Sequence, residues 1–159
     1  MRNNAFLMLI LSVLAILSSY AMQFLLDMQP CPLCIMQRFC TVVLVFLCLS
    51  YFCFERWGKK NSFLISQIIF IVLGVVLAAR QMWLQIFTHN DAGLCLPGFE
   101  QLVHYFSWDI ILKVMFWGSN ECGTVAWTLL GLPTSVWTLG FFSLMFVLWI
   151  RQVLLRGRQ

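Results

Sequence analysis

The chain has 159 residues, of which 62% are hydrophobic and only 10% charged, and its formal net charge is +4. A soluble domain of this length could not bury so much apolar surface, so the composition predicts an integral membrane protein. The length leaves room for one domain, residues 1–159. What the positive charge means depends on where the basic residues stand, and we expect membrane lipid rather than nucleic acid around this chain.

Four apolar segments are long enough to span a membrane, because a hydrocarbon core of about 30 Å needs roughly 17–25 helical residues. They are Ala5–Leu26, Ile35–Phe54, Ser62–Met82 and Thr134–Ile150. Residues 27–34 connect the first two, and residues 83–133 form the only sizeable stretch outside the predicted spans. The sequence therefore predicts an all-α integral membrane protein built as a bundle of four transmembrane helices.

The basic residues give the chain an orientation. Seven of the ten Lys and Arg residues lie on one predicted face: Arg2, Arg56, Lys59, Lys60, Arg151, Arg156 and Arg158. The positive-inside rule makes that face cytoplasmic, so both termini are expected to be cytoplasmic. The two loops at 27–34 and 83–133 are then on the outer, periplasmic side. Four cysteines fall in those loops: Cys31, Cys34, Cys95 and Cys122.

The N-terminus permits a second interpretation. Arg2, the apolar run Phe6–Leu17 and the small residues that follow imitate a signal peptide with its cleavage site. The apolar character continues to Leu26 before Asp27 ends it, which favours a retained first helix. Cys31 stays on the outer side under either interpretation.

The second segment opens with the motif Cys31-Pro32-Leu33-Cys34. A C-x-x-C pair is a common thiol-exchange motif, and thiol pairs persist as working disulfides outside the reducing cytosol. Pro32 suits the first turn of a helix, where its missing N–H costs little. Cys34 then lies in the first turn, where unpaired N–H groups and the helix dipole favour a thiolate.

A zinc site is the main alternative for this pair. No histidine stands beside the motif and no second C-x-x-C follows, which weighs against zinc. A haem attachment motif would need a histidine directly after Cys34, and Ile35 stands there instead. We therefore expect no metal at these cysteines.

Arg38 follows Cys34 by one helical turn on the same face. A guanidinium buried near the outer interface is costly without a partner, and the Cys34 thiolate or the carbonyl oxygens of a bound quinone would be such a partner. The alternative is an interface anchor that reaches the lipid headgroups. Arg80 and His89, near the outer end of the third segment, could approach the same region, although single ionisable residues there are usually anchors.

Cys95 and Cys122 stand 27 residues apart in the long loop. A permanent disulfide between them would contribute about 4 kcal/mol through loop entropy, and the sequence does not exclude it. That role leaves the first pair unexplained, whereas four outward cysteines suit a relay of thiolate attacks. Between them, apolar residues recur at helical spacing over Gly98–Trp117. This pattern predicts a short amphipathic helix lying in the interface or packed on the bundle's outer end.

Three other cysteines fall inside or at the far end of the second segment. They are Cys40, Cys48 and Cys53. Because lipid or protein surrounds such positions, we expect small buried hydrophobic residues rather than exchanging thiols.

Three sequence blocks resemble the DsbB family of bacterial inner-membrane thiol oxidases. They are Cys31-Pro-Leu-Cys-Ile-Met-Gln-Arg38, Cys95-Leu-Pro-Gly-Phe-Glu100 and Trp117-Gly-Ser-Asn-Glu-Cys122, the last continuing through Trp127-Thr-Leu-Leu-Gly-Leu132. With the four-segment topology, the resemblance covers nearly the whole chain. One departure is Pro133, because the family usually places this proline just before the tryptophan equivalent to Trp137. The departure concerns the local geometry of the loop.

The resemblance implies a four-helix bundle with a site for ubiquinone or menaquinone near the start of the second helix. It implies a quinone-dependent disulfide oxidoreductase that reoxidises a soluble, DsbA-like periplasmic oxidase. By that similarity, the reduced partner would attack Cys95, and Cys122 would then exchange with Cys31. Cys34 and Arg38 would face the quinone.

Two other function classes fit parts of the sequence. A metal-binding membrane protein would use the cysteines as soft ligands, but the outward loops add only His89 and His104 and no methionine cluster. A structural four-span protein would use two disulfides to staple its loops, and it predicts fixed bridges. A disulfide oxidase predicts cysteines that change redox state with partner and quinone.

Overall fold

The computed structural model describes residues 2–25, 31–53, 60–87, 108–109, 115–116, 118, 128–129 and 131–156. Most of these residues lie in four long helices, α1 (Arg2–Leu25), α2 (Pro32–Cys53), α3 (Lys60–Phe87) and α6 (Thr134–Arg156). Each helix contains a stretch long and apolar enough to cross a membrane: Asn4–Leu25, Pro32–Phe52, Ser62–Phe87 and Thr134–Leu155. The predicted all-α, four-helix membrane fold is therefore confirmed.

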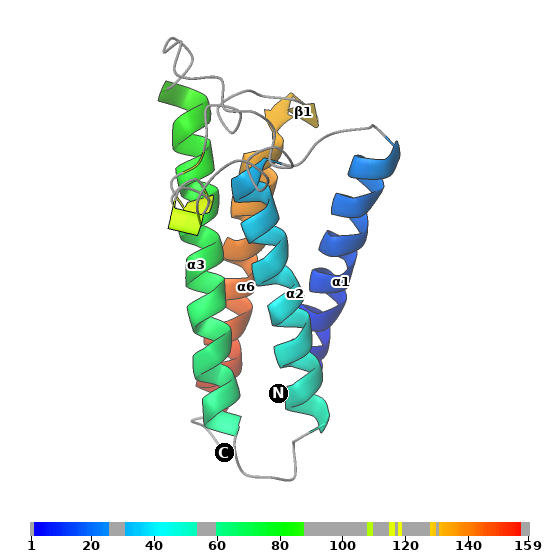
Figure 1. Cartoon of the computed structure of the whole chain (residues 1–159). Helices are drawn as coiled ribbons and strands as arrows, with labels where there is room; N and C mark the ends of the chain where they lie inside the picture. Colours follow the sequence, from blue (N-terminus) through cyan, green and yellow to red (C-terminus); the bar gives the residue numbers. More distant parts are fainter. Residues whose placement is uncertain are drawn as a thin grey trace.

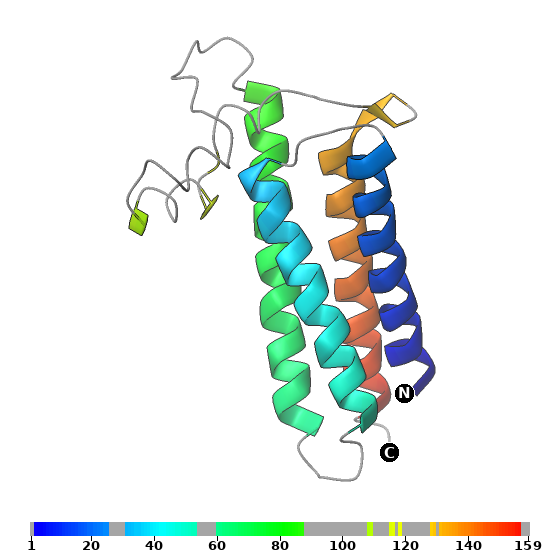
Figure 2. The same ribbon diagram turned by 45° about the vertical axis from the view of Figure 1, so that its right-hand side comes forward.

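The four helices form a closed ring in which neighbours run in opposite directions (Figure 1). Helix α2 packs between α1 and α3, and α6 closes the ring against α3 and α1. The starts of α1 and α3 lie at one end of the bundle, together with the ends of α2 and α6 (Figure 2). The start of α2 therefore lies at the opposite end, beside the last turns of α3.

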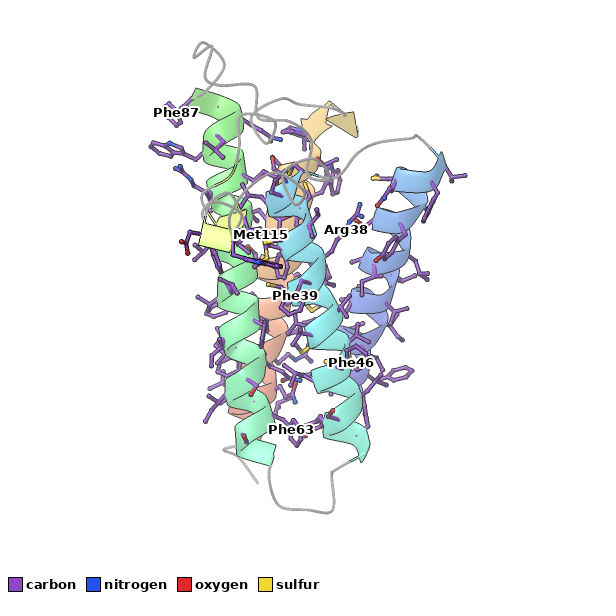
Figure 3. The ribbon with its side chains drawn as sticks, viewed as in Figure 1. Arg38, Phe39, Phe46, Phe63, Phe87 and Met115 are labelled. Atoms are coloured by element: carbon purple, nitrogen blue, oxygen red, sulfur yellow. The ribbon has the colours of Figure 1, made fainter. Side chains whose placement is uncertain are left out.

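Buried apolar side chains from all four helices fill the bundle axis. They are Met8, Leu33, Cys40, Leu44, Cys48, Ile71, Leu77, Phe142, Met145 and Leu148. Other apolar side chains point away from the bundle, as Phe46 does in Figure 3. Helices that are apolar all round, with their backbone hydrogen bonds satisfied internally, are suited to a lipid environment.

Helices α3 and α6 approach each other closely at Gly74. The ring of the fully buried Phe142 lies against this glycine, and a Cβ atom added there would overlap the ring. Further along the same pair, Trp149 Nε1 donates a hydrogen bond of 3.0 Å to the carbonyl oxygen of Leu64. Small residues at such crossings let helix backbones pack tightly in membranes.

The third helix is longer than the predicted span. It continues past Met82 to Phe87, although Gln85 lies in this extension and Gln81 just before it. Gln81 and Gln85 are both buried, and each has a hydrogen-bond partner on a neighbouring helix. Because glutamine is a good helix former and these amides are satisfied inside the bundle, they do not end the helix.

A short hairpin that the sequence analysis did not predict leads into α6. Strands β1 (Thr128–Leu129) and β2 (Leu132–Pro133) pair antiparallel, with Thr128 opposite Pro133. Gly131 has a φ of 79°, a left-handed conformation that favours glycine. Pro133, the departure from the family pattern, thus ends a strand directly before the helix begins.

The predicted amphipathic helix over Gly98–Trp117 lies almost entirely outside the described residues. Trp108 and Asp109 are helical and exposed, and Met115 and Phe116 are also helical.

Candidate functional site

Cys31 and Cys34 meet at the start of α2. Their sulfur atoms lie 2.7 Å apart, and both side chains are partly buried. A disulfide bond is about 2.05 Å long, so a small side-chain movement would close the bond. The C-x-x-C motif therefore presents a dithiol whose geometry permits reversible oxidation.

Cys31 caps the N-terminus of this helix. Its carbonyl oxygen accepts a hydrogen bond of 3.1 Å from the Ile35 N–H, and its sulfur accepts one of 3.3 Å from the Cys34 N–H. The sulfur thus takes the place of the side-chain oxygen of an ordinary N-cap residue, near the positive end of the helix dipole. Pro32 occupies the first turn, as predicted.

The sequence predicts Cys34 in the first turn of this helix, where the helix dipole favours a thiolate, and the structure confirms that position. The Cys34 N–H donates to the Cys31 sulfur, because the side chain of an N-cap residue folds back over the turn that follows it.

A side-chain donor at Cys34 comes from α3. Gln81 Nε2 lies 3.3 Å from Cys34 Sγ and 3.8 Å from Cys31 Sγ. Gln81 Oε1 accepts a hydrogen bond of 3.0 Å from Gln37 Nε2. Both glutamines are buried, with exposed fractions of 5% for Gln37 and 3% for Gln81. Neither glutamine was predicted as a site residue from the sequence, although a polar side chain inside a membrane helix is itself a signal of function.

Arg38 lies one turn after Cys34, but its guanidinium turns toward α1 (Figure 3). Its Nε donates to Ser19 Oγ at 2.7 Å, its Nη2 to the Ser19 carbonyl oxygen at 3.1 Å, and its Nη1 to Gln23 Oε1. Its Cζ also lies 5.3 Å from the centre of the Tyr20 ring, within the range of a cation–π contact. The sequence predicts Cys34 or a quinone as the partner of Arg38. In the structure, Ser19 and Gln23 of α1 accept its hydrogen bonds.

Gly118 packs directly against the C-x-x-C motif. A Cβ atom added there would lie 2.7 Å from Leu84 Cδ1 and 2.8 Å from Leu33 Cδ1, and Leu33 is part of the motif. The φ of Gly118 is 84°, which other residues rarely adopt.

The other candidate residues are placed as follows. Arg80 lies on α3 directly before Gln81 and is partly buried, whereas His89, Cys95 and Cys122 lie outside the described residues. Cys40 and Cys48 are 0% exposed, which confirms that they are core residues. The side chain of Cys53 lies outside the described part. Across the described ranges, no group of three His, Cys, Asp or Glu residues is placed to hold a metal ion.

One further contact ties the helices together near the site. Ser135 Oγ, at the start of α6, donates a hydrogen bond to Gln85 Oε1, one turn beyond Gln81 on α3. Both residues are buried. Cys31, Cys34 and Arg38 lie at or near the start of α2, and their amide neighbour Gln81 lies on α3, so packed helices position all of these groups.

Comparison with known proteins assigns the chain to a family. A family model described as "Disulfide bond formation protein DsbB" matches residues 1–152. A protein named "Disulfide bond formation protein B" from Hahella chejuensis is 33% identical over 140 residues, which cover 84% of each chain. Its namesake from Stutzerimonas stutzeri is 32% identical over 142 residues, covering 87% of this chain and 86% of the relative. The one from Acinetobacter baylyi is 28% identical over 152 residues, covering 94% and 89%. The match extends across all four helices up to the last turn of α6, and the chain belongs to the DsbB family of disulfide bond formation proteins.

Proposed function

We propose that this chain is a disulfide oxidase of the bacterial inner membrane, which reoxidises a soluble periplasmic dithiol protein and passes the electrons to a membrane quinone. The observation that carries the proposal is the contact of 2.7 Å between Cys31 Sγ and Cys34 Sγ at one end of a membrane bundle. Membership of a disulfide bond formation family supports the same chemistry. The partner we propose is a DsbA-like thiol oxidase.

The distribution of charge supports the proposed orientation. Lys60 begins α3 and Arg151 lies near the end of α6, at the end of the bundle away from the cysteine pair. By the positive-inside rule this end faces the cytoplasm, which puts Cys31 and Cys34 on the periplasmic side. A disulfide there is protected from the thiol reductants of the cytosol.

The relay that we propose moves two electrons through two disulfides. A thiolate of the reduced partner attacks the Cys95–Cys122 bond at Cys95, and the partner's second thiolate then resolves this mixed disulfide, so the partner leaves oxidised. The Cys122 thiolate next attacks Cys31 and releases Cys34 as a thiolate. Cys95 resolves the bond between Cys122 and Cys31, so the first disulfide re-forms. The partner has then lost two electrons and two protons, and the Cys31–Cys34 pair has gained them.

The residues around Arg38 fit a quinone. Three of its five N–H groups donate to Ser19 and Gln23, which leaves one further N–H group on each of Nη1 and Nη2. The guanidinium can therefore donate to a carbonyl oxygen while α1 holds it in place. A bound ubiquinone or menaquinone would supply the final two-electron acceptor. Arg38 would hold and orient it, with Arg80 and His89 as further candidates.

A stoichiometric assay tests this proposal. The purified chain in lipid nanodiscs is mixed with a reduced DsbA-like protein and ubiquinone, and both thiol loss and quinone absorbance are followed. We expect one quinone to be reduced for each partner disulfide formed, and no turnover in a Cys34→Ser control. Partner oxidation without quinone loss would disprove the quinone step. If the wild-type chain oxidises no partner at all, the proposed function is wrong.

A further inference from the structure

We propose that Gln81 is a functional residue of this site, whose amide N–H groups stabilise the reduced form of the Cys31–Cys34 pair and thereby raise its reduction potential. The inference rests on the proposed function, because it assumes that this pair cycles between dithiol and disulfide. It adds to the site a residue from α3, 47 positions from Cys34 in the sequence.

The orientation of the Gln81 amide is the first step. Gln37 donates to its Oε1 at 3.0 Å, so the amide nitrogen is the atom that faces the sulfurs. That nitrogen lies 3.3 Å from Cys34 Sγ and 3.8 Å from Cys31 Sγ, within hydrogen-bonding range for sulfur. Two N–H groups on one nitrogen can therefore serve two sulfur atoms.

The division of donors between the sulfurs is the second step. Cys31 Sγ has the backbone N–H of Cys34, which the helix start supplies. Cys34 Sγ has the Gln81 Nε2 group from α3, at 3.3 Å. Gln81 thus gives Cys34 what the N-terminus of α2 gives Cys31, an N–H group aimed at the sulfur.

The effect on redox equilibrium is the third step. A thiolate is a strong hydrogen-bond acceptor, whereas the sulfurs of a disulfide are weak ones, so an N–H donor stabilises the reduced state more than the oxidised state. A stabilised reduced state makes the pair a stronger oxidant. Losing a hydrogen bond to a charged group changes an equilibrium by about tenfold or more.

A purely structural role for Gln81 makes a different prediction. The Gln37–Gln81 bond also links α2 to α3, and a buried amide without a partner would be costly. If linking the helices were its only role, replacing Gln81 would lower stability and leave the reduction potential unchanged. Measuring the potential therefore separates the two roles.

The experiment isolates the pair in the full-length chain by replacing Cys95 and Cys122 with Ser. The protein is equilibrated in buffers of reduced and oxidised dithiothreitol, and Cys31 and Cys34 are trapped by alkylation and quantified by peptide mass spectrometry. The reagent loses two electrons and two protons as its own disulfide forms, while the Cys31–Cys34 bond breaks and takes them up. We expect Gln81→Leu to need an about tenfold higher ratio of reduced to oxidised reagent at half-reduction. That change equals a potential about 30 mV lower.

Three further variants control this result. Gln81→Met keeps the side-chain length without an N–H group and should give the same shift, even if Gln81→Leu folds poorly. Gln37→Met removes the group that orients the amide, so it should give a smaller shift in the same direction. Gln85→Leu is the matched control, because Gln85 is buried one turn away but bonds to Ser135, and its midpoint should equal the wild-type value.

The outcomes separate this inference from the proposed function. A wild-type pair that cannot be reversibly reduced and reoxidised would sink the proposed function, and the inference with it. A reversible wild-type pair with unchanged midpoints in both Gln81 variants would overturn the inference alone. An equal shift in Gln85→Leu would also overturn it, because the effect would then come from helix packing.

Discussion

Two sets of cysteines, one at the start of α2 and one along it, lie in opposite surroundings. Cys31 and Cys34 lie at the helix start, with their sulfurs in contact and an N–H donor at each. Cys40 and Cys48 lie in the core and are 0% exposed. They are eight residues apart, which is about 12 Å along a helix, so they cannot form a disulfide with each other. Cysteines thus form a candidate redox pair at the start of the helix and are buried core residues further along it.

The glutamines beside these cysteines sharpen the contrast. Gln67 Nε2 lies 3.6 Å from Cys48 Sγ, much as Gln81 approaches Cys34. The Gln67 Oε1 atom, however, is buried without a hydrogen-bond partner in the described structure, whereas Gln81 Oε1 is held by Gln37. An amide beside a thiol is therefore not sufficient. Two features distinguish the site at Cys31 and Cys34 from the surroundings of Cys48: a second sulfur within reach, and the start of a helix.

The largest effect should separate the two cysteine sets. Replacing Cys31 or Cys34 by Ser should abolish steady oxidation of the soluble partner, because the pair can no longer form a disulfide. Replacing Cys40 or Cys48 by Ala should leave the rate largely intact, since a thiol inside the bundle cannot reach an aqueous disulfide. The measurement is the rate of partner oxidation with excess quinone. A well-folded Cys48→Ala variant without turnover would contradict the comparison.

Replacing Arg38 should have the next largest effect. Arg38→Leu removes the guanidinium between α2 and α1, and we expect at least a tenfold loss of quinone-supported turnover. Arg38→Lys should keep part of the activity, because it retains the charge but not the planar fork. Ser19→Ala should cost less, since it loosens the guanidinium without removing it.

Two measurements test this role of Arg38. Partner oxidation is followed across quinone concentrations, and exchange between the partner and Cys95 is followed in a single turnover without quinone. We expect the first to fail in Arg38→Leu and the second to survive. An unchanged quinone dependence would reduce Arg38 to a membrane anchor.

A smaller effect should follow from Gly118, which packs on Leu33 of the C-x-x-C motif. Gly118→Ala introduces a Cβ between Leu33 and Leu84 at a φ of 84°, so it should slow transfer between the two cysteine pairs several-fold. Gly131→Ala is the matched control, because its φ is 79° but an added Cβ meets nothing within 4 Å. Quenched-flow alkylation measures the transfer. Equal slowing in both variants would mean that backbone strain, not the contact, matters.

The smallest effect on chemistry should come from the core. Gly74→Ala would push a methyl group into the ring of Phe142, and overpacking of this kind typically costs about 1–3 kcal/mol. We expect a lower Tm and an unchanged Cys31–Cys34 potential. Gly140→Ala, where an added Cβ meets open space, should show neither change. A shifted reduction potential of the Cys31–Cys34 pair in Gly74→Ala would show that packing in the core is coupled to this pair.

The sequence predicted the features that depend on local pattern. Hydropathy located four membrane helices, and Pro32 located the start of α2 within the C-x-x-C motif. The burial of Cys40 and Cys48 followed from their position inside an apolar segment. These features need no knowledge of which helix packs against which.

The features that were missed depend on packing between distant segments. Gln81 meets Gln37 across 44 residues, and Arg38 meets Ser19 across 19. Spacing along one helix could place Arg38 on the face of Cys34 but could not show that its guanidinium would turn to α1. The hairpin at Thr128–Pro133 was missed because its strands are only two residues long.

The central claim is that Cys31 and Cys34 carry electrons between a soluble dithiol and the membrane. The most direct test is thiol trapping at these two residues in the purified wild-type chain. We predict that they become alkylated after reduced partner is added without quinone, and resist alkylation once quinone is supplied. If the alkylation of this pair changes neither with reduced partner nor with quinone, the result would contradict the account and favour a structural role for these cysteines.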